Sequence, residues 1–335
     1  MALWEKNRSE EVAKLALWLS GLVTFEQAAE ILWRVGRIKI SRSSVWREAQ
    51  VWGARIGEIE EAERIVANAL PGIRDTLRRE AQSGPRMGVA MDGSMIHIRD
   101  EGWKELKIGC VFEVEVRPTR DRETGDWEDV AHAVNNSYRA HLGGPEHFGE
   151  AVWAEARQRG WERAIDTQVI ADAAHWIWNV AAHYFYDSLC IVDWYHGTEH
   201  LAQSARLLKG EGTLAAQRWF NARQTTLFQG HAARIAAELY QAAQDQPARA
   251  ADLRSQAGYF RNNQHRMNYQ EMREAGWAIG SGMVECGAKM YKARFAGPGM
   301  RWSRKGAENL LPVRSALLSR RFDARWHQAY HSPQN

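Results

Sequence analysis

Three carboxylates in the sequence occupy positions where α/β proteins gather functional groups. Asp92 lies inside an apolar stretch that alternates like a strand, and a carboxylate is costly to bury there unless it is paired or binds a metal. Asp172 follows the short apolar run 167–171, and sites form at the carboxyl ends of such strands. Glu285 lies one turn into an expected helix and follows two glycines. Two strands and one helix could therefore bring three oxygen ligands together across sequence spacings of 80 and 113 residues.

Such a set of carboxylates could supply the protein ligands of a divalent-metal site. Mg²⁺ takes oxygen ligands and is usually held by few carboxylates, with waters and phosphate oxygens completing its shell. Two such ions can activate an attacking hydroxyl and stabilise the leaving oxygen of an in-line phosphoryl transfer. The sequence therefore predicts that Asp92, Asp172 and Glu285 bind Mg²⁺, or Mn²⁺, and catalyse this chemistry.

The elements expected around these residues form one sheet with helices. Alternating and short apolar runs predict five strands, separated by helical patterns. The strands fall at residues 86–99, 104–117, 127–140, 167–173 and 188–194, and helices at 146–160, 175–185 and 278–295. Residues 195–276 form an alanine-rich helical block without a strand-like run. The expected fold class is α/β, a ribonuclease-H-like core with a mixed five-stranded sheet, flanking helices and an all-α insertion.

The N-terminal region reads as helical. Thr24 and Gln27 form a capping box at the start of one helix, and Ser41 begins the next after a short turn with Gly36. Two helices joined in this way look like a helix-turn-helix, whose second helix reads DNA, although a plain helical hairpin has the same pattern. The expected DNA contacts are the polar residues at the start of the second helix, Arg42, Ser43 and Arg47.

Basic residues are concentrated near the C-terminus. Between Lys289 and Arg325 there are ten basic residues and two acidic ones, whereas the whole chain has a formal charge of only +3. Lys289 and Lys292 share a helix face with Glu285 and are expected to hold phosphates beside the metals. A solvated, salt-bridged helix face is the alternative. The expected DNA track continues through Arg294, Arg301, Trp302, Arg304 and Lys305, with Trp302 either stacking on DNA or anchoring a turn.

The composition is that of a globular protein with more than one domain. Hydrophobic residues make up 45% and charged residues 25% of 335 residues, which excludes disordered and fibrous classes. The three cysteines are widely spaced, and neither a signal peptide nor a long apolar stretch is present, so a cytoplasmic, nucleoid-associated protein without a membrane partner is expected. The expected domains are an N-terminal helical DNA-binding domain at 1–75, the first part of the catalytic core at 85–200, the helical insertion at 201–276, and the last core helix with the basic segment at 277–326.

Several motifs together resemble a known family. MDGS around Asp92, VIADAAHWIWN around Asp172, CIVDWYHGTEHL, IGSGMVECGAK around Glu285 and the tail ARFAGPGMRWSRKG are similar to motifs of the DDE transposases of bacterial insertion sequences. The nearest group is the Kra-type elements, allied to the Mutator-like superfamily. The resemblance covers about Met87 to Trp326. It implies that Asp92, Asp172 and Glu285 are the catalytic triad of a transposase that uses Mg²⁺ or Mn²⁺ to nick and transfer DNA strands without a covalent enzyme intermediate.

The resemblance also implies supporting roles for Asp193 and His196, which match a family signature after the fifth strand. Asp193 is the rival of Asp172 for the second metal-ligand position. The implied partner is DNA, as transposon terminal repeats and as target. Because two transposon ends must be joined, a homodimer is expected at least on DNA.

Two other functions fit parts of the sequence. Residues 196–200, HGTEH, have the pattern of inverted zinc metallopeptidases, with His196 and His200 as ligands and Glu199 as base. That pattern leaves Asp92 and Asp172 without a role. The second alternative is a domesticated or inactive DNA-binding protein, or a nuclease, of the same fold.

Overall fold

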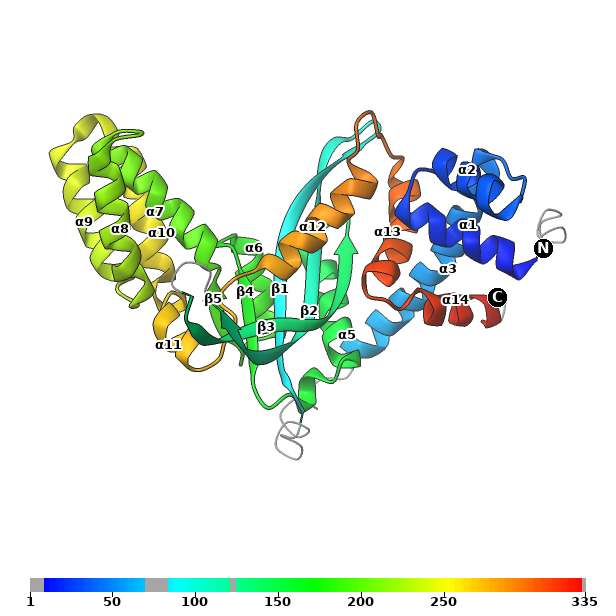
Figure 1. The fold of residues 1–335 in the computed structure, drawn as a ribbon, viewed down its shortest axis with the longest axis horizontal. Coiled ribbons are helices and arrows are strands. Elements are labelled where there is room, and N and C mark those ends of the chain that lie inside the picture. The colour runs from blue at the N-terminus through cyan, green and yellow to red at the C-terminus, as the bar shows by residue number, and fades with distance from the viewer. Residues whose placement is uncertain (1–8, 70–83, 121–124, 333–335) are drawn as a thin grey trace.

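The computed structural model describes residues 9–69, 84–120 and 125–332, and the domain boundary expected near residue 75 lies outside them. A twisted sheet occupies the middle of the molecule (Figure 1). A helical insertion extends to one side of the sheet, and helices from both ends of the chain gather on the other side. The element order therefore places parts that are distant in sequence next to one another.

The sheet is mixed and five-stranded, so the α/β class expected from the sequence is confirmed. Its strands are β1 (Arg86–Ile98), β2 (Gly102–Arg120), β3 (Trp127–His141), β4 (Thr167–Ala171) and β5 (Leu189–Val192), in the order β3-β2-β1-β4-β5. β1, β2 and β3 are antiparallel neighbours, whereas β1, β4 and β5 are parallel. The short β4 is buried throughout, as a strand covered on both faces should be.

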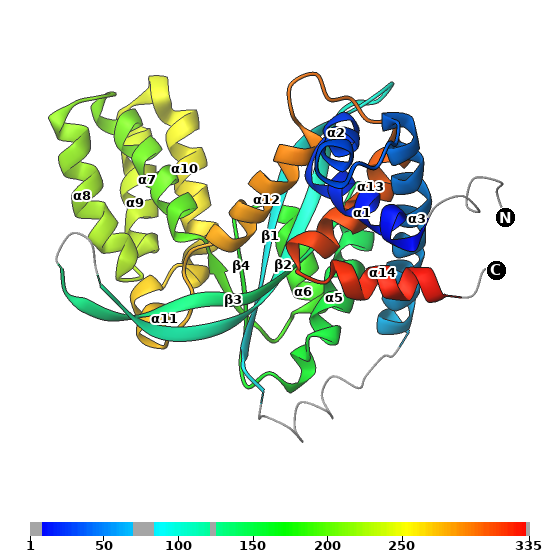
Figure 2. The same ribbon diagram turned by 45° about the vertical axis from the view of Figure 1, so that its right-hand side comes forward.

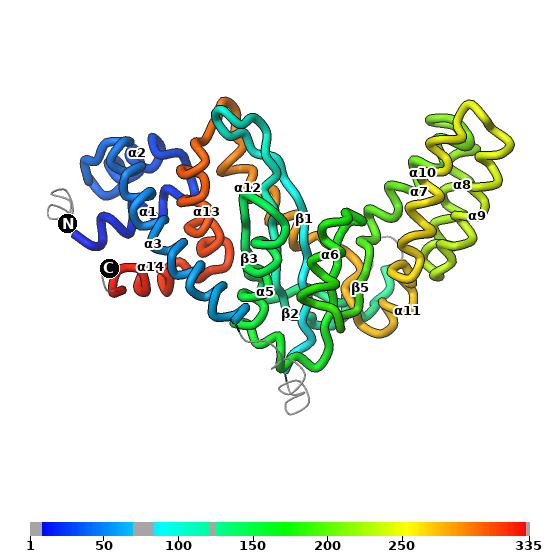
Figure 3. Tube along the Cα trace, turned by 180° about the vertical axis from the view of Figure 1, so that it is seen from behind, coloured from blue at the N-terminus to red at the C-terminus, as the bar shows by residue number. Residues whose placement is uncertain are grey.

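Three helices flank the sheet. α5 (Pro145–Gln158) and α6 (His175–Tyr184) lie on the face seen from behind in Figure 3, and α12 (Gly282–Phe295) crosses the opposite face. α12 packs closely because of Gly287, where an added Cβ atom would lie 2.5 Å from Cε1 of Tyr138. Gly109 of β2 allows α5 to pack closely in the same way, because a Cβ atom added to Gly109 would lie 2.6 Å from Cγ2 of Val152. Small residues therefore set the distance at which both layers lie.

The insertion between β5 and α12 is entirely helical among its described residues, as expected. Its helices are α7 (Trp194–Lys209), α8 (Leu214–Phe228), α9 (Ala232–Asp245), α10 (Ala250–Asn263) and α11 (Tyr269–Glu274). They enclose buried leucines such as Leu201, Leu227 and Leu239, and they extend away from the sheet (Figure 2). None of the helices in the described part of the chain has both the length and the apolar character that crossing a membrane requires.

The first and last helices of the described chain pack together into what we call the terminal bundle. It contains α1 (Glu10–Leu22), α2 (Phe25–Gly36), α3 (Arg42–Asn68), α13 (Arg304–Leu318) and α14 (Phe322–His331). The predicted capping box of Thr24 and Gln27 is present, and Ser41 caps α3. α3 touches the backbone of α13 at Gly53, where an added Cβ atom would clash with the carbonyl oxygen of Asn309. The basic C-terminal segment thus belongs largely to this bundle.

Candidate active site

Strand register places three aspartates side by side at one edge of the sheet. Met91 of β1 pairs with Ala171 of β4, and Ala171 pairs with Val192 of β5. The next residue on each strand is Asp92, Asp172 and Asp193, respectively. Parallel neighbours in register therefore bring the two predicted strand carboxylates, and the rival Asp193, to the same place.

The start of α12 brings Glu285 to this edge. The backbone N–H of Ser281, the N-cap residue of α12, donates to Oδ2 of Asp193. The hydroxyl of Ser281 donates to Oε1 of Glu285 over 3.2 Å. The N–H of Trp194, the first residue of α7, donates to the carbonyl of Ile279 over 2.9 Å. These bonds tie the start of α12 to the start of α7, and Ser281 is a positioning residue that the sequence alone did not single out.

Asp92 lies within electrostatic reach of Asp172 and Glu285. Burial raises the pKa of Asp92 above its ordinary value, and the negative charges of Asp172 and Glu285 raise it further. The N–H of Gly93 donates to Oδ1 of Asp92 over 2.7 Å, and this bond and the charge of His196 act in the opposite direction. Crowded carboxylates repel one another, and a bound cation would relieve that repulsion.

Asp193 is fully buried, and hydrogen bonds from the protein occupy its carboxylate. Oδ1 accepts from the backbone N–H of His196 over 2.8 Å and from the ring Nδ1 of His196 over 3.1 Å, and Oδ2 accepts from Ser281. Burial would raise the pKa of Asp193, but these hydrogen bonds outweigh burial and lower it. The same bond to Asp193, aided by the charge of Asp172, raises the pKa of His196 to about 9 against the effect of its burial. At neutral pH the pair is therefore a carboxylate bound to an imidazolium.

Two sets of residues could hold a metal here. The ligand atoms of Asp193, His196 and Glu285 lie within 4.8 Å of one another, the one such group of His, Cys, Asp and Glu among the described residues. A protonated histidine is not a ligand, however, and the oxygens of Asp193 already accept hydrogen bonds. Asp92, Asp172 and Glu285 offer the carboxylate oxygens that Mg²⁺ and Mn²⁺ prefer. By its chemistry this donor set suits such a cation, with Asp193 behind it as an orienting residue. The ligand atoms of Asp92, Asp172 and Glu285 do not, however, form a group within 4.8 Å among the described residues.

Replacing Asp193 by Asn should uncouple His196. The wild-type imidazole should titrate with a pKa of about 9, falling toward the ordinary 6.5 in Asp193→Asn. A folded-state pKa above the unfolded value adds stability that is complete below pH 6.5 and lost as pH rises through 9. The free energy of unfolding, measured from pH 6 to pH 10, should therefore decline in the wild type more than in the variant.

NMR titration of the histidine ring carbons measures the pKa of His196 in the wild type and in Asp193→Asn. The resonance of His196 is identified as the one missing from the spectrum of His196→Gln. A His196 pKa that stays near 9 in Asp193→Asn would show that another group holds the proton.

The metallopeptidase alternative lacks its geometry. His200 places its Nδ1 2.8 Å from Oε1 of Gln256 and stacks on Tyr259 at 3.6 Å between ring centroids. Within the described ranges, no group of potential ligands contains both His196 and His200. His200 therefore joins α7 to α10, and the structure does not bring it together with His196 as a potential ligand.

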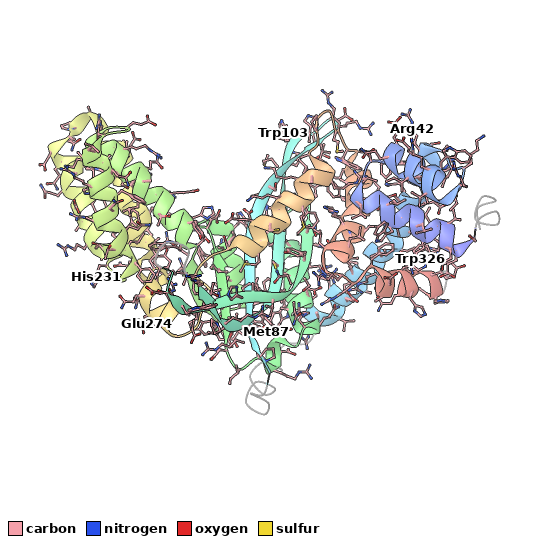
Figure 4. All side chains as sticks on the ribbon, viewed as in Figure 1. Arg42, Met87, Trp103, His231, Glu274 and Trp326 are labelled. Atoms are coloured by element: carbon pink, nitrogen blue, oxygen red, sulfur yellow. The ribbon has the colours of Figure 1, made fainter. Side chains whose placement is uncertain are left out.

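The expected DNA-contacting residues divide into two classes. The first class is exposed and could contact a polyanion. It consists of Arg42, Ser43 and Arg47 at the start of α3, Lys289 and Lys292 on α12, and Arg301 and Lys305 after α12. Arg42 lies at the surface of the terminal bundle (Figure 4). The other class consists of three residues that the protein itself uses.

Arg294, Trp302 and Arg304 correct the expectation of a continuous basic track. Arg294 is only 2% exposed, its Nε donates to the carbonyl of Ser20, and its guanidinium lies 5.0 Å from the ring centroids of Phe25 and Trp302. Burial lowers its pKa to about 10. Trp302 is 8% exposed and donates its ring N–H to the carbonyl of Phe295. Both residues join α12 to the terminal bundle, so neither is free to contact DNA.

Arg304 is held by an ion pair. Its Nε donates to Oε1 of Glu101 over 2.8 Å, its Nη2 pairs with Oε2, and its Nη1 donates to the carbonyl of Leu142 over 3.0 Å. A paired guanidinium offers a phosphate little free charge. The corrected set of basic residues is thus Lys289, Lys292, Arg301 and Lys305.

No protein-family model matches the sequence, and no curated protein matches it.

Proposed function

We propose that the protein is a DDE-type DNA transposase that nicks and transfers DNA strands at the ends of an insertion sequence, using a divalent metal. The observation that carries the proposal is the row of Asp92 and Asp172 on neighbouring parallel strands, with Glu285 close enough to raise the pKa of Asp92. Three neighbouring carboxylates repel one another, and a bound cation would relieve that repulsion. The motif resemblance names the same three residues.

A ribonuclease-H-like core is the finer fold that we propose. Three antiparallel strands, then two parallel ones reached through helices, agree with it in order and direction. The helical insertion falls before α12, where the resemblance expects it.

Each residue of the site has a role in this proposal. Asp92, Asp172 and Glu285 would hold Mg²⁺ or Mn²⁺, which when bound stabilises charge on phosphoryl oxygens and activates a hydroxyl for attack. Asp193 fixes the His196 ring, whose imidazolium is charged at neutral pH. Its Nε2–H would donate to a phosphate oxygen of the cut strand. Lys289 and Lys292 follow Glu285 at one and two turns on α12 and would hold neighbouring phosphates.

The N-terminal helices supply recognition of the DNA ends in this proposal. α2 and α3 follow each other through a short turn, and the exposed Arg42, Ser43 and Arg47 lie in the first two turns of α3. A second copy of the chain on the DNA would provide the second active site that joining two ends requires.

Strand cleavage by the purified full chain tests the proposal. A supercoiled plasmid carrying the gene with its flanking DNA is the donor, a second plasmid is the target, and Mg²⁺, Mn²⁺ or EDTA is added. Metal-dependent nicks at the same two flanking positions, and joined donor–target products, are expected. Nicks without joining would indicate a nuclease, whereas intact plasmids with retained DNA binding would indicate a domesticated regulator.

The Lys289→Ala variant should bind DNA less tightly and with a weaker dependence on salt. Each phosphate contact releases about one counterion, so the slope of log affinity against log salt should fall by about 1. Fluorescence anisotropy with labelled duplex DNA over a range of salt concentrations measures this slope.

Arg234→Ala is the matched control, because Arg234 is exposed on α9, at the far side of the insertion from α12 (Figure 1). Equal slopes for Lys289→Ala and the wild type would remove α12 from the DNA interface.

A further inference from the structure

A cavity of about 700 Å³ lies beside the candidate active site. We call it the side cavity. It opens to the surface and is lined by β3, the starts of α7 and α12, the end of α8, α11 and the segment between α11 and α12. In Figures 1 and 2, β3 runs beneath the insertion toward α11. Its volume is in the range of about 300–1,000 Å³ that is usual for small-molecule sites.

The side cavity and the candidate active site share the same two helix starts. Trp194 and Tyr195 line the cavity and directly follow the buried Asp193. Gly282 and Met283 also line it, between Ser281 and Glu285. A molecule in the cavity would therefore contact residues that are next to Asp193 in the first segment and close to Glu285 in the second.

Four of the lining residues are aromatic: Trp194, Tyr195, Phe228 and Trp277. Tyr195 is 62% exposed, and its Cε2 lies 3.4 Å from where a Cβ atom on Gly280 would be, so the absence of a side chain at Gly280 leaves room beside the ring. None of the aromatic rings in the described ranges stacks on Tyr195. Trp277 is half-buried and held by Arg86, whose guanidinium lies 4.8 Å from its ring centroid. Trp194 is fixed edge-on by Phe228 at 5.5 Å. The cavity thus offers rigid flat surfaces, with the face of Tyr195 open.

The polar groups of the cavity suit a nucleotide. No carboxylate is among its lining residues in the described part of the chain, and Gln224 supplies an amide. The guanidinium of Arg273 also lines the cavity but pairs with Glu128 of β3. Gly282, the first residue of α12, carries no side chain, and no side chain caps this helix. An uncapped helix start leaves backbone N–H groups for an anion such as phosphate.

We propose that the side cavity binds one unstacked nucleobase of the DNA strand that the active site processes, with the base on the Tyr195 ring. This inference rests on the proposed function. A base that has left its stack offers a π face to aromatic side chains and hydrogen-bonding edges to an amide, and these match Tyr195 and Gln224. Holding that base would fix the neighbouring phosphate next to Asp92 and Glu285.

A fluorescent probe tests the inference. The probe is a short oligothymidylate with a single 2-aminopurine, whose fluorescence falls when the base stacks on an aromatic ring. With the full wild-type chain, binding should quench the probe. Tyr195→Ala should lose the quenching and weaken binding about tenfold, whereas Tyr195→Phe, which keeps the ring, should retain both.

A second variant leaves Tyr195 in place. Thr225 is exposed on α8 and lines the cavity, so Thr225→Trp should fill the space and weaken binding to a similar degree. Gln217→Trp, exposed on the same helix but outside the cavity, is the matched control and should bind like the wild type.

The outcomes separate this inference from the proposed function. If the wild type binds the probe without quenching, or if Tyr195→Ala and Thr225→Trp bind as the wild type does, the side cavity is not a base site, and metal-dependent nicking is unaffected. If the chain binds neither the probe nor duplex DNA, both proposals fail. If Tyr195→Ala does not fold, the binding of the probe by Tyr195→Phe and Thr225→Trp still shows whether the side cavity binds a base.

Discussion

Asp92→Asn should abolish strand nicking and strand transfer while leaving DNA binding intact. Asn keeps the shape of the Asp92 side chain but removes the negative charge that would bind the metal beside Asp172. Loss of metal-based charge stabilisation of about 4 kcal/mol corresponds to about a 10³-fold lower rate. The rate of nicking in Mg²⁺, measured on the plasmid with flanking DNA, checks the prediction.

The same substitution should not destabilise the apo protein. Burial and the charges of Asp172 and Glu285 raise the pKa of Asp92, so a neutral side chain relieves repulsion. The melting temperature without metal should be equal to or higher than that of the wild type. Asp100→Asn, at the exposed turn of the same hairpin in a left-handed conformation that Asn tolerates, should retain full activity. Normal nicking by Asp92→Asn would refute the assigned site.

Arg139→Met should be the most destabilising single substitution that we predict. Arg139 of β3 is buried, and its guanidinium pairs with Glu60 and Glu63 of α3 and with Glu155 of α5, the last over 3.1 Å. Glu155 is equally buried. Removing one partner of a buried ionic network leaves charge without compensation and costs about 3–5 kcal/mol. Chemical denaturation at neutral pH measures the loss.

An exposed pair provides the contrast. Arg34 and Glu30 pair at 2.8 Å on α2, one turn apart, with both side chains largely exposed. Arg34→Met should change stability by less than about 0.5 kcal/mol, because exposed pairs contribute little. If Arg139→Met cost no more than Arg34→Met, the network would be incidental to the joining of the terminal bundle to the sheet.

The sequence predicted the strands well because their patterns are local. The sequences of β1 and β2 alternate in part, and β4 and β5 are short apolar runs, so the positions of these strands could be predicted from local patterns. The central residues of β1 and β2 are nevertheless buried continuously. The register that aligns Asp92 with Asp172 was not accessible in the same way, since it depends on pairing between distant strands. It was the order of the elements along the chain that indicated a shared edge.

The charge composition of the C-terminal segment led to a wrong prediction for Arg294, because burial determines whether a basic residue can contact DNA. Arg294 has the same charge as the exposed Arg301, but contacts with Ser20, Phe25 and Trp302 enclose it. Those contacts join the N-terminal helices to the C-terminal segment, and no local pattern reveals them. The side cavity escaped prediction for the same reason, because β3, α8 and α11 meet there from distant parts of the chain.

The composition of the terminal bundle has a consequence for synthesis on the ribosome. α1 to α3 are translated first, but α13 and α14, against which they pack, leave the ribosome after the sheet and the insertion. α12, with Glu285, also comes late. A nascent chain therefore holds Asp92 and Asp172 without their third carboxylate, and its early helices expose the surface that α13 will cover. Chains cut short before α12 should therefore expose apolar surface, be prone to aggregation, and lack one of the three carboxylates of the candidate site.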